Sequence, residues 1–177
     1  MMTMVTGQSK KMMTMNIKHS FQPTGNSCGP TCLYMALNYK LNVPNDLPFD
    51  VESKFSIEEI CEMCGTDWIV GTPPDRMEKG MSALSLKHIE YQGSPRPFEL
   101  LREILENNNI PILRTITKGV PHWILIKGFM GYEFYVNDPW LGEIIYSEKE
   151  LNEIWKIRNY QFFEIINKDD EYSRRHS

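Results

Sequence analysis

The chain contains Gln22-Pro-Thr-Gly-Asn-Ser-Cys-Gly-Pro-Thr-Cys-Leu-Tyr-Met-Ala-Leu-Asn-Tyr39, in which a polar loop leads into a helix. From Gly29 onward the residues are compatible with a helix, and apolar side chains recur on one face at helical spacing (Cys32, Leu33, Ala36 and Leu37). Pro30 is tolerated because the first turn of a helix has backbone N–H groups without intrahelical partners. The stretch therefore predicts that a loop delivers Cys28 to the start of a helix.

The predicted position of Cys28 favours a reactive thiolate, because the free amides and the dipole at a helix N-terminus stabilise an anion. The alternative is that Cys28 is a small buried hydrophobic residue, the usual fate of a free cysteine. Burial alone does not explain the polar, glycine-containing approach through Gly25, Asn26 and Ser27. Cys28 is therefore a candidate nucleophile.

Size and composition indicate one ordinary globular domain. The chain has 177 residues, of which 41% are hydrophobic and 24% charged, and this length is enough for a single core. A net charge of −4 without a basic stripe argues against a nucleic-acid binder. No apolar run approaches the roughly 18 residues that a membrane span needs.

The domain is expected to cover residues 17–167, between two tails. Residues 1–16 are rich in methionine and polar residues and lack the continuous apolar core of a secretory signal, so we interpret them as a loose tail or the edge of a longer chain. Residues 168–177 have the composition of a second solvated tail.

The four cysteines allow two interpretations besides catalysis. A disulfide framework is not needed in a chain of this size, and Cys28 and Cys32 with Cys61 and Cys64 could in principle form a four-cysteine zinc site. Against zinc, neither pair is flanked by knuckle-like turns, and Cys32 falls on the core face of its helix. We expect reduced thiols, no metal or other cofactor, and action in a reducing compartment such as the cytoplasm of the producing cell or of a target cell.

The periodicity changes halfway along the chain. Helices are predicted first, over residues 56–64, 78–91 and 98–107, and again over 147–155. Capping boxes are expected at Ser56 with Glu59 and at Ser147 with Glu150. Strands are predicted over residues 110–117, 122–128, 133–138, 143–146 and 160–166. This order favours an α+β fold, with the cysteine helix in a helical N-terminal part and an antiparallel sheet in the C-terminal part.

The second and third of these strands suggest a partner for Cys28. If the hairpin pairs Lys127 with Glu133, its charges match, one face is apolar, and His122 lies opposite Asp138. An aspartate can fix the tautomer of an imidazole and stabilise its charged form. A satisfied histidine at a strand edge and an Asp-Pro strand terminator are the structural alternative. With the cysteine upstream, we favour a Cys–His–Asp catalytic site.

These residues together resemble the papain-like cysteine peptidases, and more specifically the C39 peptidases that process bacteriocin leaders at double-glycine sites, with their stand-alone relatives. The resemblance runs from about residue 22 to residue 166. It is carried by Gln22, Cys28-Gly-Pro-Thr31, the Asn109–Leu113 strand, Pro121–Phe129 and Val136-Asn-Asp-Pro139.

The resemblance implies a role for each of several residues. Cys28 would be the nucleophile, His122 the general base and acid, and Asp138 the residue that orients the histidine. Gln22 would donate from its side-chain amide into the oxyanion hole, together with the backbone N–H of Cys28. Trp140 would shield the contact between histidine and acid. Trp123 and Trp140 are also weaker candidates for contact with substrate.

The expected reaction is hydrolysis of a peptide bond after a Gly-Gly or similar small pair in a protein or peptide substrate. One departure is Ser27, which stands where leader-processing peptidases often carry an acidic residue. Three alternatives stay open. The same machinery could cleave another amide, in peptidoglycan or a ubiquitin-like tail. The chain could be a bacterial effector or toxin domain whose partner is an immunity or inhibitor protein, or a catalytically idle binding module.

Overall fold

The structure is a computed structural model that describes residues 11–42 and 54–167. In chain order its elements are β1 (Met12–Thr14), α2 (Cys28–Lys40), α4 (Ile57–Cys64), α5 (Pro74–Ala83), β2 (His88–Tyr91), α6 (Pro97–Glu106), β3 (Ile110–Thr117), β4 (Val120–Met130), β5 (Glu133–Asp138), β6 (Gly142–Ser147), α7 (Glu148–Trp155), the 3-10 turn η1 (Lys156–Arg158) and β7 (Phe162–Ile165). None of the helices in these two ranges is long and apolar enough to cross a membrane.

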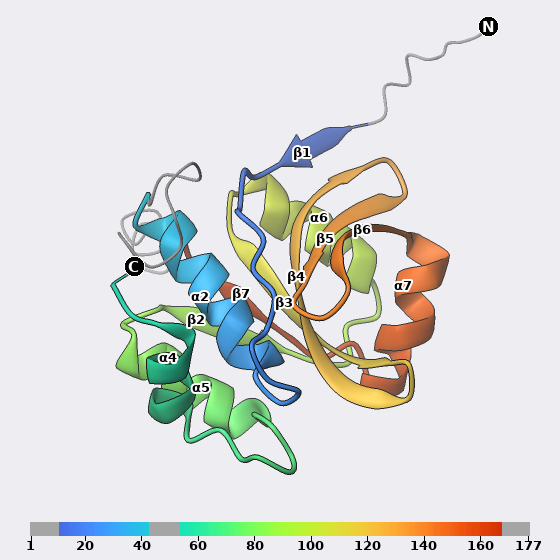
Figure 1. The fold of residues 1–177 in the computed structure, drawn as a ribbon. Helices are drawn as coiled ribbons and strands as arrows, with labels where there is room; N and C mark the ends of the chain where they lie inside the picture. Colours follow the sequence, from blue (N-terminus) through green and yellow to red (C-terminus); the bar gives the residue numbers. More distant parts are fainter. Residues whose placement is uncertain (1–10, 43–53, 168–177) are drawn as a thin grey trace, which may run out of the picture.

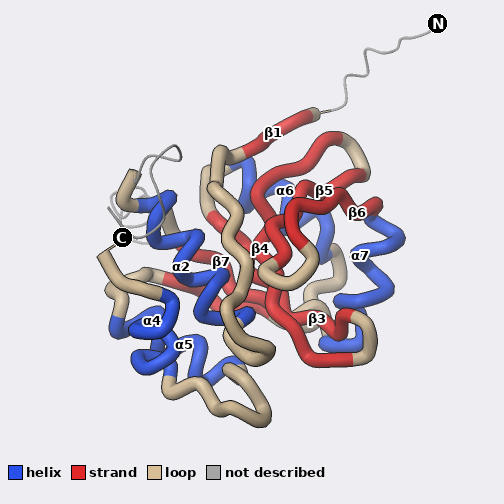
Figure 2. Tube along the Cα trace, in the orientation of Figure 1, coloured by secondary structure: helices blue, strands red, loops and turns tan. Residues whose placement is uncertain are grey.

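One antiparallel sheet organises the molecule. Its strands lie in the order β2-β7-β3-β4-β5-β6, and β1 pairs with the far half of β4. Figures 1 and 2 show the helices α2, α4 and α5 on one side of the sheet and α6 and α7 on the other. The expected α+β fold with an antiparallel sheet in the second half is confirmed.

Two adjacent residues of β7 show why both faces of the sheet are covered. Phe162 packs against Trp155 of α7, with ring centroids 5.6 Å apart. Phe163 faces the other way and stacks on Trp123, whose ring also lies against the start of α2. Both phenylalanines are fully buried. Alternate residues of a strand point to opposite faces, so an apolar pair in sequence predicts a strand buried on both sides.

Most of the predicted elements are confirmed. Helix α2 begins at Cys28, and the strands β3 and β5 have the predicted bounds. Both capping boxes form: Ser56 with Glu59 starts α4, and Ser147 with Glu150 starts α7.

The helix predicted over residues 78–91 is wrong in both bounds. Helix α5 begins at Pro74, because a proline fits the first turn of a helix, and it ends at Ala83. Ser85 then takes a left-handed conformation with a φ of 57°, which a helix cannot contain. The next residues form β2, which extends the sheet by pairing with β7. The tertiary pairing outweighs the local helical pattern.

The N-terminal tail expected over residues 1–16 is also partly wrong. Residues 12–14 form β1, which pairs with residues 128–130 of β4, and Met15 is buried. Residues 1–10 and the expected tail over 168–177 lie outside the described residues. The edge of β4 beyond its pairing with β3 is thus covered by a segment that the sequence alone did not mark as a strand.

Gly128 is what lets β1 approach β4 so closely. A Cβ added at this residue would lie 2.4 Å from the carbonyl oxygen of Met13 and 2.8 Å from the Cα of Thr14. Both atoms belong to the backbone, so a side chain cannot simply turn away. We expect Gly128→Ala to lower the free energy of unfolding by about 1–3 kcal/mol and to speed amide exchange at Met15, whose N–H bonds to Lys127.

Chemical denaturation and hydrogen exchange would measure these two effects. Gly25→Ala is the matched control, because a Cβ added there meets nothing within 4 Å. Equal stability of the two variants would contradict the role given to Gly128.

Candidate active site

The loop before α2 holds Cys28 at the first helical position. The Ser27 hydroxyl donates to the carbonyl oxygen of Thr24 at 3.0 Å and accepts from its N–H at 3.1 Å, which closes a tight turn. The amide of Asn26 donates to the carbonyl oxygen of Asp67 at 2.9 Å and ties this loop to the one before α5. Cys28 is 7% exposed and lines a cavity. Cys28 therefore belongs to the edge of the hydrophobic core and also faces the cavity.

His122 and Asp138 meet as expected, although the predicted strand register is wrong. The Nε2 atom of His122 lies 2.7 Å from Oδ1 of Asp138, and both side chains are buried. The hairpin pairs Leu125 with Asn137 and Ile126 with Val136 rather than placing His122 directly opposite Asp138. The contact is diagonal across the two strands, which is within reach of a histidine.

A short turn and a β-bulge explain the shifted register. Strand β4 runs on to Met130, which lies opposite Glu133 in place of Lys127, so only Gly131 and Tyr132 connect the two strands. The pairing then slips by one more residue between Ile126 and Gly128. Lys127 instead forms an ion pair with Glu143 of β6. A bulge adds one residue to one strand and cannot be read from charge matching alone.

Asp138 is fixed by the turn that follows it. Its Oδ1 also accepts from the backbone N–H groups of Trp140 at 2.7 Å and Leu141 at 3.1 Å. Its Oδ2 is buried without a hydrogen-bond partner among the described residues. The carboxylate is therefore held in one orientation, with His122 as its side-chain donor.

The pKa of His122 shows the effect of these neighbours. Burial lowers it, but hydrogen bonds with Asp138 and with Cys28, and the charges of the same two groups, raise it to about 9 from the ordinary 6.5. Since Nε2 bonds to Asp138, Nδ1 is the ring nitrogen left for the thiol. The arrangement favours the imidazolium form of His122.

The tryptophans expected near the site differ in placement. Trp140 stands edge-on to His122, with ring centroids 5.9 Å apart, and Lys118 lies 5.5 Å above its indole. It covers the histidine as the resemblance implies. Trp123 also lines the cavity, but it is almost fully buried and donates from Nε1 to the carbonyl oxygen of Thr72 at 2.8 Å. Its main contacts are structural.

The comparisons with known proteins now decide the family. Residues 14–163 match the Peptidase_C39 like family. The chain belongs to this family. No curated protein sequence matches it. The match to the family confirms the resemblance to C39 peptidases that the sequence motifs indicated.

Solved structures of C39 peptidase domains share the fold. The peptidase domain of Streptococcus ComA, a bifunctional ABC transporter, is 15% identical, with a TM-score of 0.65 over 86% of this chain and 100% of that one. A C39-like peptidase from Bacillus anthracis is 11% identical, with a TM-score of 0.67 over 89% and 98%. A double-glycine-motif protease from an AMS/PCAT transporter, crystallised with its leader peptide, is 19% identical, with a TM-score of 0.63 over 89% and 93%.

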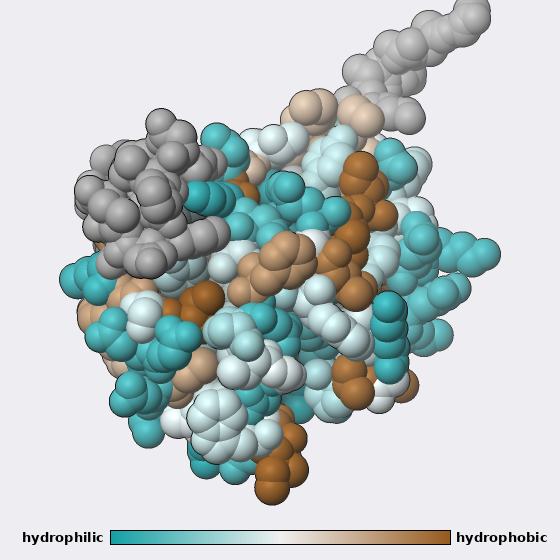
Figure 3. All heavy atoms as spheres, in the orientation of Figure 1, coloured by the Kyte–Doolittle hydropathy of each residue, from teal (hydrophilic) through white to brown (hydrophobic). Residues whose placement is uncertain are grey.

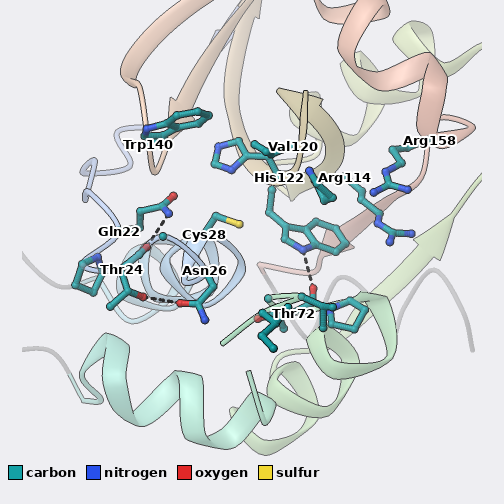
Figure 4. A pocket seen from close by; sticks show the side chains of 18 residues that line it. Gln22, Thr24, Asn26, Cys28, Thr72, Arg114, Val120, His122, Trp140 and Arg158 are labelled. Atoms are coloured by element: carbon teal, nitrogen blue, oxygen red, sulfur yellow. Dashed lines mark hydrogen bonds between the residues drawn. The ribbon is translucent and has the colours of Figure 1, made fainter. Parts of the chain in front are cut away.

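Gln22 lies beside Cys28 in this C39 fold, as Figure 4 shows. Its backbone N–H bonds to the carbonyl oxygen of Pro139 at 2.8 Å, which joins the loop before α2 to the turn after β5. Its side-chain Nε2 donates to the carbonyl oxygen of Thr24 at 2.7 Å. One amide proton is thus engaged by its own loop, and the second is the one available for an oxyanion.

The cavity around these residues has a volume of about 950 Å³. Its walls come from residues 22–26 and Cys28, from the loop between α4 and α5, from the hairpin of β3 and β4, and from Trp140 and Arg158. The lining residues that were not predicted from the sequence include Ile69, Val70, Arg114 and Arg158.

The loop between α4 and α5 forms an apolar rim, defined as Trp68, Ile69 and Val70, all highly exposed. Figure 3 shows hydrophobic atoms gathered over this loop at the bottom of the view. Asp67 shapes the rim by accepting from the N–H groups of Ile69 and Val70 at 2.7 and 2.9 Å. An Asp-to-Gly71 turn that carries three apolar residues is the sequence signal that could have identified it.

The other three thiols have different surroundings. The described residues hold no group of three or more His, Cys, Asp or Glu that could bind a metal. Burial raises the pKa of Cys32 well above its ordinary value and that of Cys64 to about 12, and it also raises the pKa of Cys61. Cys32 is fully buried, as its place on the helix predicts.

We expect Cys28 to react with iodoacetamide well before Cys32, Cys61 and Cys64. Cys28 lies at a helix N-terminus with His122 as a hydrogen-bond partner, whereas burial raises the pKa of the other three thiols. Timed labelling followed by peptide mass spectrometry gives the four rates. Equal rates, or faster labelling of the half-buried Cys61, would contradict the assignment of Cys28 as the activated thiol.

Proposed function

We propose that the protein is a cysteine endopeptidase in which Cys28, His122 and Asp138 carry the reaction. The observation that supports this most directly is that Cys28, at the N-terminus of α2, shares a cavity with a buried histidine whose other nitrogen is 2.7 Å from an aspartate. Membership of the C39-like family supports the same reaction.

The chemistry follows from the positions of these groups. The Cys28 thiolate attacks the carbonyl carbon of the peptide bond, and the Cys28 backbone N–H with the Gln22 amide stabilises the oxyanion. The His122 imidazolium gives its proton to the leaving amine, then takes one from the water that hydrolyses the acyl-enzyme. Asp138 keeps the ring oriented and favours its charged form. No step needs a metal or an organic cofactor.

The proposed substrate is a protein or peptide with a pair of small residues at the cleaved bond. The support is the double-glycine protease that shares the fold and was crystallised with its leader peptide. Glycine orders at an entropic cost, so residues elsewhere in the substrate must supply binding energy. The apolar rim is suited to an apolar upstream segment, because Ile69 and Val70 both line the cavity and face solvent. We therefore propose that this contact lies on the helical side of the cleft.

Cleavage products of a peptide library, identified by mass spectrometry, would test the function. We expect hydrolysis by the wild-type protein and none by Cys28→Ala, together with labelling of Cys28 by an active-site-directed electrophile. A wild-type protein that neither cleaves nor labels would leave only a binding module and overturn the proposal.

The pH dependence follows from His122. Its pKa of about 9 in the folded chain lies above the ordinary 6.5, so the imidazolium persists through neutral pH and is lost as the pH rises through 9. We expect kcat/KM to fall as the pH rises through about 9, which gives the pH profile an alkaline limb there. The stability that the protonated pair contributes is likewise fully present below about pH 6.5 and lost as the pH rises through about 9.

Asp138→Asn separates this effect from general damage. Without the carboxylate the alkaline limb should move toward lower pH, and activity should fall less than in Cys28→Ala because orientation is a supporting role. Profiles of kcat/KM against pH for both proteins measure the shift. An unchanged limb in Asp138→Asn would remove Asp138 from the mechanism.

A further inference from the structure

One end of the cavity carries two arginines that the proposed mechanism does not use. Arg114 comes from β3 and Arg158 from η1, and both line the cavity. Figure 4 shows them on the side away from Trp140, with Cys28 and His122 between. Both residues are half-buried.

The fold leaves most of their positive charge uncompensated. Arg114 donates from Nη1 to the side-chain oxygen of Gln161 at 3.0 Å, and that amide in turn donates to Glu90 at 2.6 Å. Among the described residues, neither arginine has a carboxylate oxygen within 4.0 Å. The Nε atom of Arg158 is buried without a hydrogen-bond partner in the same part of the chain.

The two guanidinium groups also destabilise each other. Burial and the charge of Arg158 lower the pKa of Arg114, and the charge of Glu90 only partly opposes them. A guanidinium has five N–H donors, of which Arg114 directs only one to Gln161 in the structure. Two like charges at one end of a cavity, with free donors, form a site that an anion would stabilise.

The position of Arg114 places such an anion close to the reacting bond. Arg114 pairs with Trp123 across β3 and β4, and the neighbouring Thr115 pairs with His122. A strand rises about 3.3 Å per residue, so the site lies within a few residues of the cleaved bond along an extended peptide.

We propose that Arg114 and Arg158 form a carboxylate-binding subsite, and that the natural substrate presents a carboxylate to it within a few residues of the cleaved bond. This inference rests on the proposed peptidase function. The planar guanidinium matches a carboxylate in a bidentate geometry, which Lys does not. The carboxylate could belong to an Asp or Glu side chain or to the free C-terminus of a peptide, and these two sources predict different substrates.

Matched peptides test the subsite during turnover. In quenched fluorescent peptides with a central Gly-Gly, a single residue is set to Glu or Gln at each of four positions on either side, and each peptide is made with a free or an amidated C-terminus. We expect one position, or the free terminus, to raise kcat/KM by roughly tenfold to a hundredfold. In Arg114→Gln and in Arg158→Gln, the ratio of kcat/KM between the two matched peptides should fall to about one. Arg96→Gln, which alters an exposed arginine outside the cavity, should keep it.

Binding to the Cys28→Ala protein tests the subsite without turnover. Its dissociation constants for the same Glu and Gln peptides should differ by a similar factor, and the difference should vanish when either cavity arginine is replaced. If nothing is cleaved but this difference is present, the peptidase proposal fails and the subsite stands. Equal binding and equal cleavage of all matched pairs, or a preference that survives both arginine substitutions, would overturn the subsite.

Discussion

Replacing Cys28 with alanine is expected to lower kcat by about four orders of magnitude or more, because no other described thiol reaches His122. The thiol is the atom that forms the acyl-enzyme, so the loss should appear in kcat and not as weaker binding. Single-turnover rates with saturating enzyme would separate the two. The fold should be little affected, since the side chain is small and lies at the wall of the cavity.

Cys61→Ser is the matched control for this variant. Cys61 is a half-buried thiol on α4 that does not line the cavity, so its replacement should leave the single-turnover rate unchanged. Substantial residual turnover in Cys28→Ala would show that the cysteine serves structure, and the proposed mechanism would have to be abandoned.

Changing either glycine of the cleaved pair to leucine should lower kcat/KM by about a thousandfold. The carbonyl carbon must come close to the thiol while its oxygen reaches the Gln22 amide and the Cys28 N–H, and a bulky side chain would keep the backbone away from both. Steady-state rates on the paired substrates would measure this effect. Alanine should be tolerated better than leucine, since the cause is volume.

Two controls make the substrate test specific. A leucine placed several residues upstream, beside the apolar rim, should not reduce cleavage, because Ile69 and Val70 offer it an apolar surface. Unimpaired cleavage of both leucine-for-glycine peptides would mean that family membership indicates the fold and the reaction type but not the specificity.

Local signals explain which features of the structure could be predicted. The turn before Cys28 and the helical spacing after it lie within one stretch, so they indicate α2 without any tertiary contact. The capping residues Ser56 and Ser147 act in the same way on α4 and α7. The contact between His122 and Asp138 was predicted correctly from a wrong register, because a diagonal pair still lies within reach of a histidine side chain.

The features that were missed depend on contacts between distant segments. Strand β1 exists because β4 has an uncovered edge, and β2 exists because β7 does. Arg114 and Arg158 are 44 positions apart in the sequence and meet only at the cavity, so neither draws attention in its own stretch. Periodicity describes single elements, while a cavity wall is assembled from several.

The bond from the Trp123 indole to the Thr72 carbonyl oxygen has a consequence for how substrate enters. It fastens the loop between α4 and α5 to β4 directly beside the thiol, and Phe163 supports the indole from beneath. The two walls of the cleft are therefore joined by a hydrogen bond in the absence of substrate. We therefore expect the width of the cleft to stay the same when a peptide binds, so that bulky side chains are excluded by the unbound structure itself and not by a closing movement.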